Sequence, residues 1–117
     1  MSDESFVRSI GRTQLSLHRH CPSPGHWVIM AVGELDLQTA ADLRAEVSAV
    51  LAERPLPIEV ELNLSGVTFV DSLGLGTLVV GYRICAELGV RFVVRNASPF
   101  VSRLLEVSGF RDQLAGV

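Results

Sequence analysis

A serine stands between an aspartate and a Leu-Gly-Leu-Gly stretch in FVDSLGLG, residues 69–76. The residues before it are typical of a strand and those after it of a helix, so Ser72 falls in the first turn of that helix. Free backbone N–H groups and the positive end of the helix dipole favour an anion at this position. Ser72 is therefore a candidate for phosphorylation or for the helix cap, and Asp71 is an equally good cap.

The helix expected over residues 72–88 carries apolar residues on two sides. The larger stripe, expected to pack on a sheet, holds Leu75, Leu78, Val79, Tyr82 and Ala86. The opposite stripe holds Leu73, Gly76, Thr77, Val80 and Ile84. This second stripe either packs on a neighbouring helix or forms an exposed strip that binds a protein partner.

The rest of the chain alternates between strand and helix patterns. Strands are expected at 14–20, 26–32, 58–64 and 91–94, and helices at about 40–52, 72–88 and 99–108. The segments 33–40 and 65–69 are expected to break the second and third strands. Asp36 or Thr39 caps the first helix, and Ser98 with Pro99 begins the last.

This pattern predicts one α/β domain in the order β-β-α-β-α-β-α, with a mixed sheet of four to five strands and three to four helices. The chain of 117 residues is long enough for one such domain. Residues 1–12 are expected to form a flexible N-terminal segment, and residues 13–117 the folded domain.

Charge and hydropathy narrow the class of function. The net charge is −3, and all ten cationic residues are arginine, whereas a dedicated nucleic-acid-binding domain usually has a basic surplus. No apolar run approaches the ~18 residues of a membrane span, and the acidic start MSDESF is unlike a signal peptide. We therefore expect a cytoplasmic protein that does not bind nucleic acid.

Two kinds of chemistry are weighed and not favoured. A nucleophile elbow requires glycine where Val70 stands, and the chain has no lysine for a phosphate-binding loop, so neither an enzyme nor a cofactor is expected. His18, His20, Cys21 and His26 could supply metal ligands, but their spacing matches no standard zinc pattern, so no metal site is expected.

Two motifs together resemble a known family. GELDLQTAADLR (33–44) and LNLSGVTFVDSLGLGTLVV (62–80) are similar to the two signature regions of the STAS domain, above all in bacterial anti-sigma factor antagonists. The resemblance implies that Ser72 is phosphorylated by the partner, an anti-sigma factor and serine kinase of the histidine-kinase-like ATPase fold. The unphosphorylated antagonist would bind this partner and free a sigma factor, and a phosphatase would reset it.

The resemblance also implies roles for the residues around Ser72. Asp71 and Asp36 would form an acidic corner beside the acceptor, and Gly74 and Gly76 would keep the turn narrow enough for the kinase. The partner surface would comprise Glu34, Asp36, Leu73, Gly76, Thr77, Val80 and Ile84.

One position departs from the family pattern. Leu73 replaces the second Ser or Thr usual in the family, and it extends the apolar strip. The alternative function within the same fold is a STAS subunit or scaffold of a lipid-transport or stress-sensing complex, which also acts by binding proteins.

Overall fold

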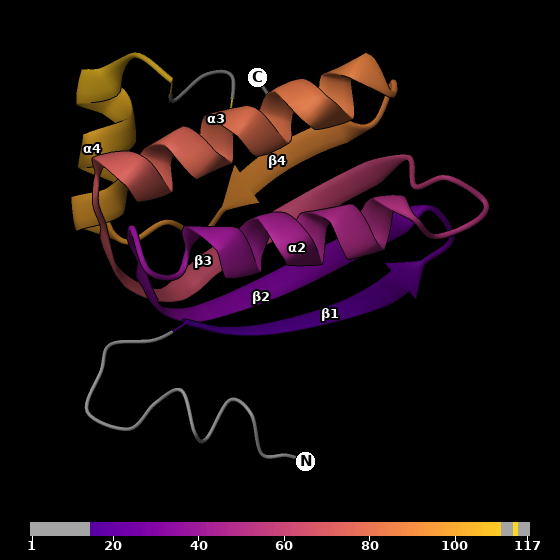
Figure 1. Ribbon diagram of the computed structural model, residues 1–117, viewed down its shortest axis with the longest axis horizontal. Helices are drawn as coiled ribbons and strands as arrows, with labels where there is room; N and C mark the ends of the chain where they lie inside the picture. Colours follow the sequence, from indigo (N-terminus) through magenta and orange to yellow (C-terminus); the bar gives the residue numbers. More distant parts are fainter. Residues whose placement is uncertain (1–14, 111–113, 115–117) are drawn as a thin grey trace.

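The computed structural model of the protein describes residues 15–110 and Leu114. The elements follow one another in the predicted order (Figure 1). The strands are β1 (Leu15–Ser23), β2 (His26–Leu35), β3 (Glu59–Val70) and β4 (Arg91–Arg95), and the helices are α2 (Ala40–Leu51), α3 (Ser72–Glu87) and α4 (Pro99–Ser108). The expected flexible segment 1–12 lies outside the described residues.

The four strands form one mixed sheet in the order β1-β2-β3-β4. β1 and β2 make an antiparallel hairpin, whereas β2, β3 and β4 are parallel. Parallel neighbours require a crossover, and α2 and α3 supply the two crossovers. These two helices lie side by side over one face of the sheet, and α4 lies near the carboxyl ends of the strands (Figure 1).

The core lies between the sheet and the two crossover helices. Val60, Leu62 and Leu64 alternate along β3 and are fully buried, as the period of two predicts for a strand with one covered face. The inner stripe of α2 consists of Leu43, Val47, Val50 and Leu51, which are all buried.

Strands β2 and β3 continue into the segments that were expected to break them. Residues 33–35 continue β2, and residues 65–69 continue β3, so neither segment is the connection that its glycine suggested. The parallel ladder passes through both segments with register shifts between Met30 and Val32 and between Gly33 and Glu34. Such irregularities let a ladder accommodate glycine and polar residues without ending.

The face of α3 that packs on the sheet overlaps only partly with the expected one. Its buried residues are Gly74, Thr77, Leu78, Gly81 and Cys85. Of the expected stripe, Leu78 is buried, Leu75 and Tyr82 are partly buried against the core, and Ala86 is exposed. A side chain at Gly74 would collide with the backbone carbonyl of Leu35. The glycines therefore let the helix approach the sheet closely, which a count of large apolar residues does not reveal.

The ends of α4 are those predicted. The Ser98 hydroxyl accepts a hydrogen bond from the Val101 amide at 3.2 Å, and Pro99 occupies the first turn. Gly109 ends the helix with φ 84°, a left-handed conformation that glycine adopts readily. In the described part of the chain, no helix combines the length and the apolar character needed to cross a membrane.

Candidate functional site

Ser72 is the first residue of α3 and follows directly on the carboxyl end of β3. Asp71, in an extended conformation with φ −96° and ψ −177°, is the N-cap of the helix. Ser72 is exposed, and its hydroxyl makes no hydrogen bond within the described residues. The cap and the candidate phosphate acceptor are thus separate residues, because Asp71 fills the capping role.

The Asp71 carboxylate joins two segments of the chain. Its Oδ1 accepts a hydrogen bond from the Gly74 amide at 2.8 Å, which satisfies a free N–H of the first helical turn. Its Oδ2 accepts from the Leu37 amide at 3.3 Å, and its backbone N–H donates to the Leu35 carbonyl at 3.1 Å. The start of α3 is therefore fastened to the segment that leaves β2.

That neighbouring segment holds Asp36, which orders its own turn. Asp36 Oδ1 accepts hydrogen bonds from the amides of Gln38 at 2.9 Å and Thr39 at 3.1 Å. The Thr39 hydroxyl donates to the Glu34 carbonyl and accepts from the Asp36 amide, both at 2.9 Å. The turn is thus fixed internally, and it brings Asp36 to the same end of the sheet as Asp71.

The expected partner strip is exposed at four of its five positions on α3. Leu73, Val80 and Ile84 are 52%, 41% and 40% exposed, and an added Cβ at Gly76 would meet no atom within 4 Å. Thr77 is the one member of the strip on α3 that is buried. Its side chain faces inward, only 6% of the residue is exposed, and its hydroxyl donates to the Leu73 carbonyl at 3.1 Å.

Sequence reasoning missed Leu37 as a surface feature of this end of the molecule. Leu37 follows Asp36 and is 67% exposed, although its backbone amide is bonded to Asp71. The remaining expected residue, Glu34, is half-buried in β2 and pairs in register with Phe69 of β3. A leucine in a turn, outside any helical or strand period, was the available signal for Leu37.

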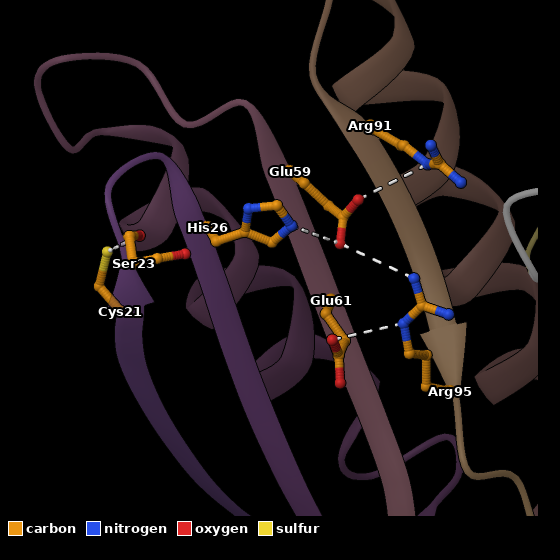
Figure 2. Close-up of polar contacts among 7 residues, drawn as sticks. All are labelled: Cys21, Ser23, His26, Glu59, Glu61, Arg91 and Arg95. Atoms are coloured by element: carbon orange, nitrogen blue, oxygen red, sulfur yellow. Dashed lines mark hydrogen bonds and ion pairs between the residues drawn. The ribbon is translucent and has the colours of Figure 1, made fainter.

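The opposite end of the sheet carries a cluster of charges that pair with one another (Figure 2). The Glu59 carboxylate lies 3.1 Å from His26 Nε2 and 3.6 Å from Arg91 Nε. Arg95 lies 4.0 Å from Glu59 and 3.4 Å from Glu61. Because Glu59 and Glu61 alternate with the core residues of β3, these side chains lie on the sheet face away from α2 and α3.

The histidines and cysteines do not assemble into a metal site in the described ranges, where no group of three or more His, Cys, Asp or Glu side chains could hold an ion. His18, His20 and Cys21 are exposed on β1, and the Cys21 thiol donates to the Ser23 carbonyl at 3.0 Å (Figure 2). Cys85 is buried in α3, and this burial raises the pKa of its thiol to about 11.

The molecule is a mixed sheet covered by helices, with an exposed serine at the start of α3. Comparison with known families shows which family has this fold. The model of the family described as "Mlab, STAS domain" matches residues 22–116, so the chain belongs to the STAS domain family. A similar relative is the anti-sigma F factor antagonist of Paenibacillus polymyxa, 29% identical over 96 residues, which are 82% of this chain and 79% of the relative.

Two solved structures share the fold. One is the anti-sigma factor antagonist SpoIIAA in its unphosphorylated form, with a TM-score of 0.70 and 23% identity over 84% of each chain. The other is the Bacillus cell fate determinant SpoIIAA in its phosphorylated form, with a TM-score of 0.66 and 22% identity over 84% of this chain and 87% of that chain. At these identities the likeness concerns the fold.

Proposed function

We propose that the protein is a cytoplasmic anti-sigma factor antagonist controlled by phosphorylation of Ser72, and that it acts by binding and not by catalysis. The relatives that carry this name support the proposal. The observation that carries it is the exposed Ser72 hydroxyl, which the fold does not use and which adjoins the exposed Leu73.

In this proposal, the unphosphorylated chain binds an anti-sigma factor that is also a serine kinase of the histidine-kinase-like ATPase fold, and so frees a sigma factor. The partner contacts Leu73, Gly76 and the exposed side chains further along α3. Phosphorylation places about −1.5 to −2 charge at the edge of this apolar surface. Burying that charge without a matching cation costs several kcal/mol, so the partner leaves. A phosphatase restores the binding form.

The residues around Ser72 have distinct proposed roles. Asp71 caps α3 and holds the acceptor serine at the helix start, and Gly74 sets the helix close to the end of β2. Gly76 leaves open space through which the kinase reaches Ser72, and Asp36 and Glu34 complete the acidic side of the surface. Leu73, in the place of a second hydroxyl residue, leaves Ser72 as the single acceptor of the motif.

The test is incubation with ATP and the anti-sigma factor kinase of the same organism, followed by mass spectrometry of the intact chain and its peptides. We expect one phosphate on the wild type and none on Ser72→Ala. A phosphate that persists on Ser72→Ala would remove Ser72 from its role. Asp71→Asn, which keeps the size of the cap but removes the charge, serves as a second variant because it leaves the acceptor in place.

A further inference from the structure

A groove runs between α2 and α3 on the helical face of the molecule. Its volume is about 310 Å³, and it is lined by residues of both helices, with Phe92 of β4 below them. Small side chains leave this space open, namely Ala41, Ala45 and Ser48 on α2 and Thr77 and Gly81 on α3. Sites for small-molecule ligands hold about 300–1,000 Å³. The groove lies at the lower end of this range, so it has room for one large side chain.

The groove combines apolar walls with one cation. Val80 and Ile84 line it and remain 41% and 40% exposed. Arg44 also lines it and is exposed, and no ion pair engages this guanidinium within the described residues. In contrast, Arg19 faces Glu46 at 3.7 Å, and Arg95 faces Glu61 at 3.4 Å. An exposed arginine beside an apolar groove is complementary to a carboxylate that follows an apolar residue.

The groove is continuous with the proposed phosphorylation surface. Val80 lies eight residues after Ser72 on the same helix, about 12 Å along its axis at 1.5 Å per residue. One partner can therefore cover Ser72 and the groove together. Large apolar side chains seated in a pocket carry much of the binding energy of many interfaces, and aromatic ones are prominent among them.

We propose that the groove is an anchor site in which the partner inserts one large apolar side chain, preferably aromatic, and pairs a neighbouring carboxylate with Arg44. This inference rests on the proposed function for the identity of the partner, but the chemistry of the groove is tested separately from it. Filling the groove or reversing the charge of Arg44 weakens binding without changing Ser72.

The probe for the groove is N-acetyl-L-tryptophan, which carries an indole and a carboxylate. N-acetyl-L-tryptophanamide, with the same ring and no charge, is the matched ligand. In methyl NMR titrations we expect saturable shifts at Val80 and Ile84, with the acid binding several-fold more tightly than the amide. Ala45→Leu should abolish the shifts, and Arg44→Gln should remove the preference for the acid. No saturable shift in the groove, or equal affinity for both ligands, would overturn the proposal.

Variants of the groove are then measured against the anti-sigma factor. Ala45→Leu and Arg44→Glu should weaken binding at least tenfold, whereas Arg83→Glu, an equal charge change on exposed α3 outside the groove, should have little effect. Circular dichroism melting checks that each variant is folded. If the groove variants bind the anti-sigma factor as tightly as the wild type, and the kinase still phosphorylates Ser72 in a separate assay, the anchor site alone would be overturned. Loss of Ser72 phosphorylation with a normal groove titration would overturn the proposed function alone.

Discussion

The two ends of the sheet use their polar groups in different ways. At the amino ends of the parallel strands, Glu59 is nearly buried and faces His26, Arg91 and Arg95, so the charges there are paired within the chain. At the carboxyl ends, Asp71 caps α3, but the Ser72 hydroxyl has no partner in the described part of the chain. The polar side chains at the amino ends find partners within the fold, whereas the Ser72 hydroxyl at the carboxyl ends is available to another molecule.

The largest expected difference in stability is between substitutions of the two glycines that follow Ser72, Gly74 and Gly76. In Gly74→Ala, the new methyl collides with the backbone carbonyl of Leu35, which cannot move aside as a side chain can. We therefore expect the free energy of unfolding to fall by about 3 kcal/mol, at the upper end for overpacking. In Gly76→Ala, the methyl meets nothing, and the helix gains about 0.5–1 kcal/mol. Urea unfolding measures both. Equal destabilisation by the two substitutions would contradict the difference between a packed and an open glycine.

The buried thiol of Cys85 makes the free energy of unfolding depend on pH. Burial raises the pKa of the Cys85 thiol from 9.0 to about 11. The unfolded thiol therefore ionises before the folded one, so this contribution to stability is complete below pH 9 and is lost as the pH rises to 11. The loss reaches about 2–3 kcal/mol at 1.36 kcal/mol per pKa unit.

The measurement is the free energy of unfolding between pH 8 and 11. Cys85→Ala should show a smaller decline than the wild type across this range, whereas Cys21→Ala, which alters an exposed thiol, should follow the wild type. Parallel curves for Cys85→Ala and the wild type would show that the buried thiol does not contribute.

The smallest expected effect compares the paired carboxylate with the unpaired hydroxyl. Glu59→Gln removes a charge that faces two partly exposed arginines and the His26 imidazole, and we expect the free energy of unfolding to fall by about 1 kcal/mol. Ser72→Ala removes an exposed hydroxyl without a partner and should change stability by less than about 0.5 kcal/mol. If Ser72→Ala costs as much as Glu59→Gln in urea unfolding, the hydroxyl is used by the fold after all.

The sequence was sufficient to predict the order of the elements because their apolar periods and end signals are strong. Leu43 and Val47 mark the inner stripe of α2, and Ser98, Pro99 and Gly109 mark the ends of α4. The resemblance of the motif around Ser72 predicted the family. These signals are local, so they are visible without knowledge of the packing.

The errors arose where packing overrides local pattern. Gly33 and Gly66 suggested turns, but the β2–β3 ladder absorbs them with shifts in register. Gly74 and Gly81 add no apolar side chain to the helical pattern, yet they lie on the buried face of α3. Thr77 lies between them on that face and therefore points inward. The groove between α2 and α3 depends on how two helices meet, which neither helix reveals alone.

The most direct test of the central claim is the affinity of the anti-sigma factor for the chain with and without phosphate on Ser72, measured by isothermal titration calorimetry. We predict that phosphorylation weakens binding about 100-fold or more, where each tenfold step corresponds to about 1.4 kcal/mol. Equal affinity of the two forms would contradict the claim that this unpaired hydroxyl is a switch.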